Sequence, residues 1–195
     1  MKQIPNIYLA SNSPRRKSMF EFYNLKFETI NIDFDESFTS TNPEGICREI
    51  CQGKLDTALD KIGKKHYEEA ITVVADTLVF FDGKIYGKPN NKDEARRMLS
   101  SLSGNEHSVI TAVGMCVLGE KEVFIEKTLV KFIDLSPEMI ENYLGKEVFS
   151  DKAGSYAIQS ERNFFVESIS GSYTNVVGFP MQSFLEKIKK CLEQT

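Results

Sequence analysis

The stretch Leu9-Ala10-Ser11-Asn12-Ser13-Pro14-Arg15-Arg16 joins a predicted strand to a predicted helix. An apolar strand over residues 6–11 leads into it, and a helical pattern over 14–23 follows, with Met19, Phe20 and Tyr23 as its apolar stripe. Ser13 stands where an N-cap belongs. Pro14 occupies the first helical position, where its missing N–H costs nothing. A helix that begins in this way presents unpaired backbone N–H groups and a positive dipole end, so this stretch predicts an anion site.

Two arginines strengthen that interpretation. Arg15 and Arg16 add planar guanidinium groups at the helix start, and such groups make bidentate contacts with phosphates. The alternative is an ordinary capped helix with two solvated arginines. The octapeptide alone leaves both interpretations open.

Asp76 interrupts a second informative stretch. Residues 71–75 form an apolar run of strand length that ends at Asp76-Thr77, and a second apolar segment covers 78–81 before the hairpin signal Asp82-Gly83. A carboxylate between two apolar segments is partly buried, so it needs a metal ion, a lysine or a helix terminus as its partner. Lys88, across the hairpin, either fills that role or points its ammonium at a phosphate. A purely structural ion pair is the plain alternative.

Lys54 departs from the pattern of its helix. The helix expected over 43–62 has apolar positions at Ile46, Cys47, Ile50, Cys51, Leu55, Ala58, Leu59 and Ile62. Lys54 lies four residues after Ile50, on the face that otherwise packs inward. Either its stem snorkels along apolar surface to water, or its ammonium reaches a functional cleft.

The order of the remaining elements sets the fold class. Strands are expected over 25–32, 71–81, 84–87, 107–118, 123–133 and 163–169, and further helices over 92–102, 136–145 and 181–192. This mixed order predicts an α/β fold with a partly antiparallel, twisted sheet flanked by helices. No repeat or low-complexity linker interrupts it, so residues 1–195 are expected to form one domain.

Composition excludes several classes of protein. The 195 residues are 41% hydrophobic, enough for a sizeable core, and the formal net charge is −4. Because binding to nucleic acid needs a basic surface, an acidic chain without an aromatic and basic platform is not expected to bind it. No apolar run approaches the roughly 20 residues that span a bilayer, and no signal-peptide segment is recognised, so no membrane partner is expected.

Cysteine usage points to a reducing compartment. The four cysteines contain no Cys-x-x-Cys pair, so neither a disulfide framework nor a zinc site is expected. Cys47 and Cys51 lie one helical turn apart and are either two metal ligands or, as we prefer, small buried residues on an apolar face. We therefore expect a cytoplasmic protein.

Three blocks of the sequence, in order and spacing, resemble the Maf family of septum-formation-inhibitor-like nucleotide pyrophosphatases. The first is 9–16, and the second runs from 75–77 through Gly87-Lys88-Pro89 to 102–104, with His107 and Thr111 following. The third is 151–159, continued by 171–173 and 176–180. The resemblance implies an elongated Maf/ITPase-like sheet with two lobes around a central cleft. It also implies a functional lysine on the second helix, although Gly53 and Leu55 replace the charged residue and the alanine that usually flank it.

The resemblance further implies hydrolysis of a nucleoside triphosphate to the monophosphate and pyrophosphate. Asp76 matches the family's proton acceptor, and Asp76 and Glu36 are the expected ligands of a divalent cation, Mg²⁺, Mn²⁺ or Co²⁺, with Asp35 able to share or replace the role of Glu36. The groups expected to bind the phosphates are Ser11, Ser13, Arg15, Arg16, Lys54, Lys88 and Lys152. His107 is either a general base or, as we prefer, a structural hydrogen-bonding residue.

Three positions carry the expected choice of base. Arg15, Thr77 and Gln159 agree with the subfamily that acts on dTTP and UTP, and a glutamine amide can both donate to and accept from the edge of uracil or thymine. Two alternatives remain: a 7-methyl-GTP pyrophosphatase of the same family, and a nucleotide-binding regulator of cell division without important catalysis. The expected partner is the nucleotide, with a homodimer left open.

Overall fold

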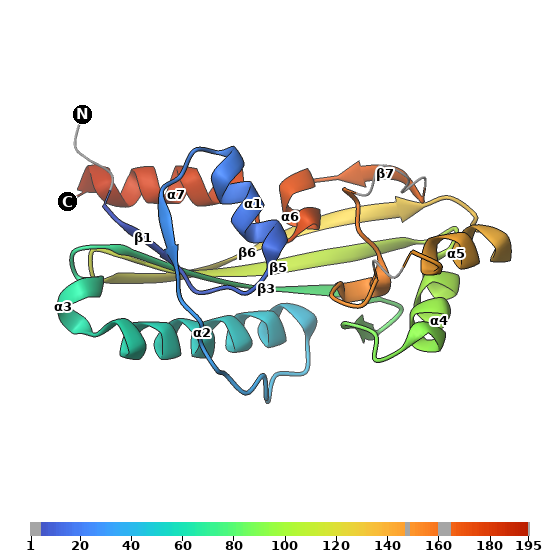
Figure 1. Ribbon diagram of the computed structural model, residues 1–195, viewed down its shortest axis with the longest axis horizontal. Helices are drawn as coiled ribbons and strands as arrows, with labels where there is room; N and C mark the ends of the chain where they lie inside the picture. The colour runs from blue at the N-terminus through green and yellow to red at the C-terminus, as the bar shows by residue number, and fades with distance from the viewer. Residues whose placement is uncertain (1–4, 147–148, 160–164, 195) are drawn as a thin grey trace. The chain divides into compact units, whose positions relative to one another are not determined.

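A mixed sheet organises the molecule (Figure 1). The computed structural model describes residues 5–146, 149–159 and 165–194. Within these ranges seven strands form one sheet in the order β2-β1-β3-β5-β6-β7, with β4 paired to β3. The strands are β1 Ile7–Leu9, β2 Phe27–Thr29, β3 Ile71–Phe81, β4 Lys84–Tyr86, β5 Glu106–Val117, β6 Glu120–Phe132 and β7 Val166–Ser170. β1 runs parallel to β2 and β3, whereas β4 and β7 run antiparallel to β3 and β6. The predicted partly antiparallel α/β fold is confirmed.

The helices of the described residues follow the predicted order with three short additions. They are α1 Pro14–Phe22, α2 Pro43–Ile62, α3 Lys64–Tyr67, α4 Lys92–Leu102, α5 Pro137–Leu144, the 3₁₀ turn η1 Ala153–Ser155, α6 Tyr173–Val177 and α7 Met181–Gln194. The sequence did not predict α3, η1 and α6. None of the described helices is long and apolar enough to cross a membrane.

The chain divides into two compact units. The first unit contains the residues up to Asp76, Thr111–Glu126 and the residues from Gly178 onward, and the second contains Thr77–Ile110 and Lys127–Val177. β3 passes from the first unit to the second between Asp76 and Thr77. β5 and β6 also contribute to both.

Helices cover both faces of the strands in the first unit, with α2 on one face and α1 and α7 on the other (Figure 1). Gly114 of β5 allows α2 to approach closely, because a Cβ atom at this position would lie 2.9 Å from Val74 and 3.3 Å from the Cys51 sulfur. On the opposite face Phe20 of α1 packs against Phe179 and Phe184, with ring centroids 5.1 and 5.5 Å away. Burial of these aromatic rings stabilises α1 against α7.

An aromatic cluster forms the core of the second unit. Phe132 of β6 lies with its ring centroid 4.8 Å from that of His107 and 4.9 Å from that of Tyr156. The rings of Tyr143 and Phe165 extend the cluster, with centroids 5.0 Å apart. This core places the segment that leads to Gln159 against β5 and β6.

The predicted N-cap of α1 and the predicted hairpin turn after β3 are both present in the structure. Ser13 is the N-cap of α1 with Pro14 at its start, although the Ser13 side chain makes no capping hydrogen bond among the described atoms. Asp82 and Gly83 have φ values of 48° and 73°, as the predicted type I′ hairpin requires. Tyr23 is 38% exposed, so the predicted apolar stripe of α1 is reduced to Met19 and Phe20.

The two apolar segments on either side of Asp76 form the single strand expected over 71–81. β3 continues from Ile71 to Phe81 through Asp76, whose carboxylate contacts a lysine and whose backbone remains extended. A charged side chain does not end a strand when a partner compensates its charge. The strand expected over 25–32 is shorter, at Phe27–Thr29, and residues 163–164 of the strand expected over 163–169 lie outside the described residues.

Candidate active site

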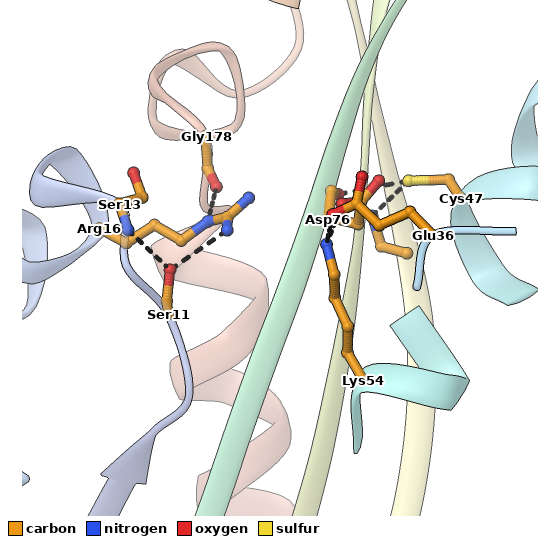
Figure 2. Close-up of polar contacts among 9 residues, drawn as sticks. Ser11, Ser13, Arg16, Glu36, Cys47, Lys54, Asp76 and Gly178 are labelled. Atoms are coloured by element: carbon orange, nitrogen blue, oxygen red, sulfur yellow. Dashed lines mark hydrogen bonds and ion pairs between the residues drawn. The ribbon is translucent and has the colours of Figure 1, made fainter. Parts of the chain in front are cut away.

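Three charged side chains of the first unit meet at Asp76 (Figure 2). Lys54 projects from α2, and its Nζ donates to Asp76 Oδ1 at 2.7 Å and to Glu36 Oε1 at 2.5 Å. The Lys54 side chain is 15% exposed and that of Glu36 59%. Asp76 itself is buried in β3. The ammonium of Lys54 thus ends at two carboxylates rather than in water, and its functional role stays a prediction.

The electrostatics of this group favour the charged forms. Burial alone would lower the pKa of Lys54, but the Asp76 carboxylate and the hydrogen bonds to Asp76 and Glu36 outweigh that effect, and the net pKa is raised above its usual 10.5. A cation held between two anions is stabilised in its protonated form. The site therefore favours positive charge at the point between Asp76 and Glu36.

The thiol of Cys47 supports the backbone at the same place. Its Sγ donates to the carbonyl oxygen of Asp76 at 3.2 Å and accepts from the amide of Ala112 at 3.3 Å. The contact ties α2 to the two strands beside the site (Figure 2). Burial, with a further contribution from the charge of Asp76, raises the pKa of this thiol. The preference for a buried structural cysteine over a metal ligand agrees with this position.

A second polar cluster surrounds the start of α1. Ser11 is buried at the end of the strand segment, and its Oγ accepts from the Ser13 amide at 3.2 Å and from Arg16 Nη1 at 3.3 Å. Arg16 Nε donates to the carbonyl oxygen of Gly178 at 2.8 Å. Burial lowers the pKa of Arg16, and the charge of Asp76 opposes this effect. Arg16 is thus anchored within the fold and interacts electrostatically with Asp76, which excludes the simple picture of two solvated arginines.

The helix start itself remains suited to an anion. The first turn of α1 contains Arg15 and Arg16 and no acidic residue. Arg15 is half-buried there. Because the dipole of a helix places positive charge at its N-terminus, the arginines and the helix start reinforce one another.

The two carboxylates fit a divalent cation. Glu36 and Asp76 converge on a single positively charged atom, and Mg²⁺ characteristically uses one or two carboxylates together with phosphate oxygens and water. No group of three or more His, Cys, Asp and Glu side chains that could hold a metal occurs within the part of the chain that the structure describes. It is Glu36, rather than Asp35, that contacts Lys54.

The other predicted residues belong to the second unit. Thr77 follows Asp76 in β3, Lys88 and Gln159 are exposed, and Lys152 pairs with Asp151. The amide of Gly154 donates to the carbonyl oxygen of Gly87 at 3.1 Å, so the loops that carry Lys88 and Lys152 are held together.

His107 has a structural environment. It is 2% exposed, and its Nε2 lies 2.8 Å from the Tyr156 hydroxyl. Burial lowers its pKa to about 4. The preference for a hydrogen-bonding role over that of a general base is supported by this enclosure.

Comparisons with known proteins place the geometry in context. The sequence profile of the family described as Maf-like protein matches residues 6–191. A protein named dTTP/UTP pyrophosphatase from Geobacillus sp. (strain WCH70) is 39% identical, covering 97% of this chain and 98% of the relative. Relatives of the same name are 42% identical in Pyrococcus abyssi and 39% identical in Halalkalibacterium halodurans, the first covering 94% of this chain and 95% of the relative, and the second 94% of both.

Proposed function

The chain belongs to the Maf family, and from this membership we propose that it hydrolyses dTTP and UTP to the monophosphate and pyrophosphate. The contact of Lys54 Nζ with both Asp76 and Glu36 is the observation that carries the proposal. This contact brings together Asp76 as the proposed base, the Lys54 ammonium and Glu36 as the second carboxylate. The near full-length similarity to proteins named dTTP/UTP pyrophosphatase supports this substrate class.

Asp76 is the proton acceptor in this proposal. Water attacks the α-phosphorus, its oxygen forms the new bond to phosphorus, and Asp76 takes its proton. The bond from the α-phosphorus to the bridging oxygen breaks, and that oxygen leaves with pyrophosphate. The Lys54 ammonium donates to the carboxylate at 2.7 Å and holds it in place within β3.

Hydroxyl, backbone, guanidinium and ammonium donors bind the phosphates in this proposal. In the first unit Ser11, Ser13, Arg15 and Arg16 offer hydroxyl, backbone and guanidinium donors at the start of α1. Arg16 is already oriented by Gly178 and Ser11, so little of its conformational freedom is lost on binding. Lys88 and Lys152 are proposed as two further donors, each with an ammonium group.

Glu36 and Asp76 are the residues that would hold a divalent cation. When bound, Mg²⁺, Mn²⁺ or Co²⁺ supplies neutralising charge for the triphosphate and an orienting centre for water. The Glu36 side chain is exposed, whereas Asp76 is buried in β3. Lys54 would then contact the phosphates in addition to Asp76.

Thr77 and Gln159 are proposed to select the base together with Arg15. The amide of Gln159 both donates and accepts, which matches the O4 and N3–H edge of uracil or thymine. Net charge −4 argues against nucleic acid as a partner. We propose the cytoplasm as the compartment on the basis of its cysteine usage, and a homodimer remains a prediction.

A pyrophosphate-release screen tests the function. We expect dTTP and UTP to be cleaved much faster than ATP, GTP or 7-methyl-GTP in the presence of Mg²⁺, Mn²⁺ or Co²⁺. Asp76→Asn should reduce turnover by about a hundredfold or more, because the amide cannot accept the proton. Asp82→Asn, the same change in the hairpin turn, is the matched control and should retain activity. Preference for 7-methyl-GTP would overturn the substrate assignment, and an absence of any turnover would favour a nucleotide-binding regulator.

A further inference from the structure

The carboxylate of Glu36 belongs to a segment that has no regular secondary structure. We define residues 33–41, between β2 and α2, as the Glu36 loop. Loops of this kind are usually more mobile than the elements they connect. A functional carboxylate has to be held within about 0.5 Å of its productive position, so something must fix this loop.

Glu49 of α2 holds the loop on the C-terminal side of Glu36. One of its carboxylate oxygens accepts from the amide and the hydroxyl of Thr39, both at 3.0 Å. The other accepts from the amide of Ser40 at 3.0 Å and from its hydroxyl at 2.6 Å. The hydroxyl and amide of Ser40, followed by the amide of Thr39, lower the pKa of Glu49 to about 2, so the carboxylate is charged at neutral pH. Four hydrogen bonds from two consecutive residues make a specific attachment.

Phe34 holds the loop on the N-terminal side of Glu36. Its ring lies directly over Gly53 of α2, where a Cβ atom would come within 2.3 Å of Phe34 Cζ and 2.5 Å of Cε2. No larger residue fits at position 53 unless this ring moves. The absence of a side chain at Gly53 therefore creates the seat for Phe34.

The attachments come from neighbouring positions of α2. Glu49 and Gly53 are four residues apart and share one face of the helix. Lys54, the residue after Gly53, contacts Glu36 itself (Figure 2). The loop is thus attached before, at and after Glu36. We propose that Glu49 and Gly53 are positioning residues that set Glu36 for the divalent cation, an inference that rests on the cation-binding role given to Glu36 in the proposed function.

Cation affinity, measured without turnover, tests the proposal. The probe is Mn²⁺, titrated by electron paramagnetic resonance in the presence of a dTTP analogue with a methylene bridge between the α- and β-phosphates. Glu49→Gln places an amide nitrogen where backbone N–H donors need an acceptor, so Mn²⁺ affinity should fall by about tenfold. Glu44→Gln removes the same charge from an exposed position of the same helix and should leave the affinity unchanged.

A double-mutant comparison separates positioning from general damage. In a Glu36→Gln background, Glu49→Gln should have no further effect on Mn²⁺ affinity, because the group that it positions has been removed. Hydrogen exchange at the amides of Thr39 and Ser40 should nevertheless accelerate in both backgrounds. Equal weakening of Mn²⁺ binding in the two backgrounds would overturn the proposal, as would faster exchange with unchanged affinity. If Glu36→Gln alone leaves Mn²⁺ binding unchanged, the metal role of Glu36 is wrong, and this inference fails even where dTTP hydrolysis stands.

Gly53→Ala is a second test variant, in which Mn²⁺ affinity and thermal stability are expected not to fall together. Alanine is the better helix former, so the thermal midpoint should rise or stay constant. The added methyl group displaces Phe34, so Mn²⁺ affinity should fall several-fold. Adding Phe34→Leu to this variant gives the methyl group room and should restore part of the affinity. A Gly53→Ala variant that binds Mn²⁺ as tightly as the wild type would contradict the role of this packing.

Discussion

At Lys54, one ammonium compensates two carboxylates, and this makes its contribution to stability dependent on pH. Because the folded-state pKa is raised above 10.5, the folded protein retains this proton at a pH where the unfolded chain loses it. The stabilisation is therefore complete below about pH 10.5 and is lost as the pH rises through the raised pKa. Chemical unfolding of the wild type and of Lys54→Met should give free energies of unfolding that converge on the alkaline side.

The control for this prediction is Lys64→Met, which removes an exposed lysine of α3. Its difference from the wild type should be small over the whole range. A difference between the free energies of unfolding of the wild type and Lys54→Met that does not shrink as the pH rises above 10.5 would contradict the prediction. At neutral pH, Lys54→Met should also hydrolyse dTTP much more slowly, because the substitution removes the ammonium that contacts Asp76 and Glu36.

His107 makes the second unit sensitive to acid. Its folded-state pKa of about 4, lowered by burial, lies below the usual 6.5, so between these values the unfolded chain binds the proton and the folded protein does not. The free energy of unfolding should therefore fall as the pH drops from about 6.5 to 4, by up to about 3 kcal/mol. Denaturant unfolding of the wild type and of His107→Gln tests this expectation, and the variant should show a flatter acid limb. His66→Gln, at an exposed position, should retain the wild-type slope.

The charged residues of the site could be predicted from the sequence more readily than the residues that hold them in position. Lys54 was visible as a charge on an apolar helix face, and Asp76 as a charge within an apolar stretch. Glu49 gave no such signal, because a glutamate on a helix and two hydroxyl residues in a loop are ordinary surface features until the loop folds back. The anchoring of Arg16 by Gly178 could not be predicted either, since it joins residues 162 positions apart.

At the scale of elements, periodicity predicted the long segments and missed the short ones. α2, α4, β3 and β5 match closely because each covers several repeats of its pattern. α3 and α6 contain four and five residues, too few for a helical period, and tertiary contacts determine them. The strand expected over 71–81 is continuous through Asp76, where Lys54 of α2 supplies the partner of the carboxylate.

At the scale of the whole molecule, the three residues that meet at Asp76 belong to one unit, whereas two of the three residues proposed to select the base belong to the other. Asp76, Lys54 and Glu36 belong to the first unit, whereas Thr77 and Gln159 belong to the second. Substitutions of Asp76, Lys54 or Glu36 should slow the hydrolysis of all nucleotides alike. Substitutions of Thr77 or Gln159 should change the ratio of the kcat/KM values for different nucleotides. Gln159→Glu leaves the pyrimidine O4 without a donor, so the preference for dTTP over GTP should fall about ten- to a hundredfold in kcat/KM.

Gln182→Glu, the same chemical change in α7, is the control for this substitution and should leave the ratio unchanged. A Gln159→Glu variant that loses activity equally on dTTP and GTP would place this residue in catalysis rather than in base selection. The measurement needs both nucleotides in parallel, because an assay with dTTP alone cannot separate the two outcomes.

Because three of the four cysteines are buried, the rate at which they are alkylated reports how often the fold opens locally. Cys47, Cys51 and Cys116 are buried, and burial raises the pKa of each, that of Cys51 to about 12, whereas Cys191 is partly exposed. Alkylation requires a thiolate that the reagent can reach, so iodoacetamide should modify Cys191 rapidly in the native protein and the other three slowly. Mass spectrometry over time should therefore show one early adduct, followed by further adducts at the rate at which α2 separates from β3 and β5. Addition of a dTTP analogue should slow the alkylation of Cys47 and Cys51, so the decrease in their alkylation rate measures how much of the protein has bound the ligand.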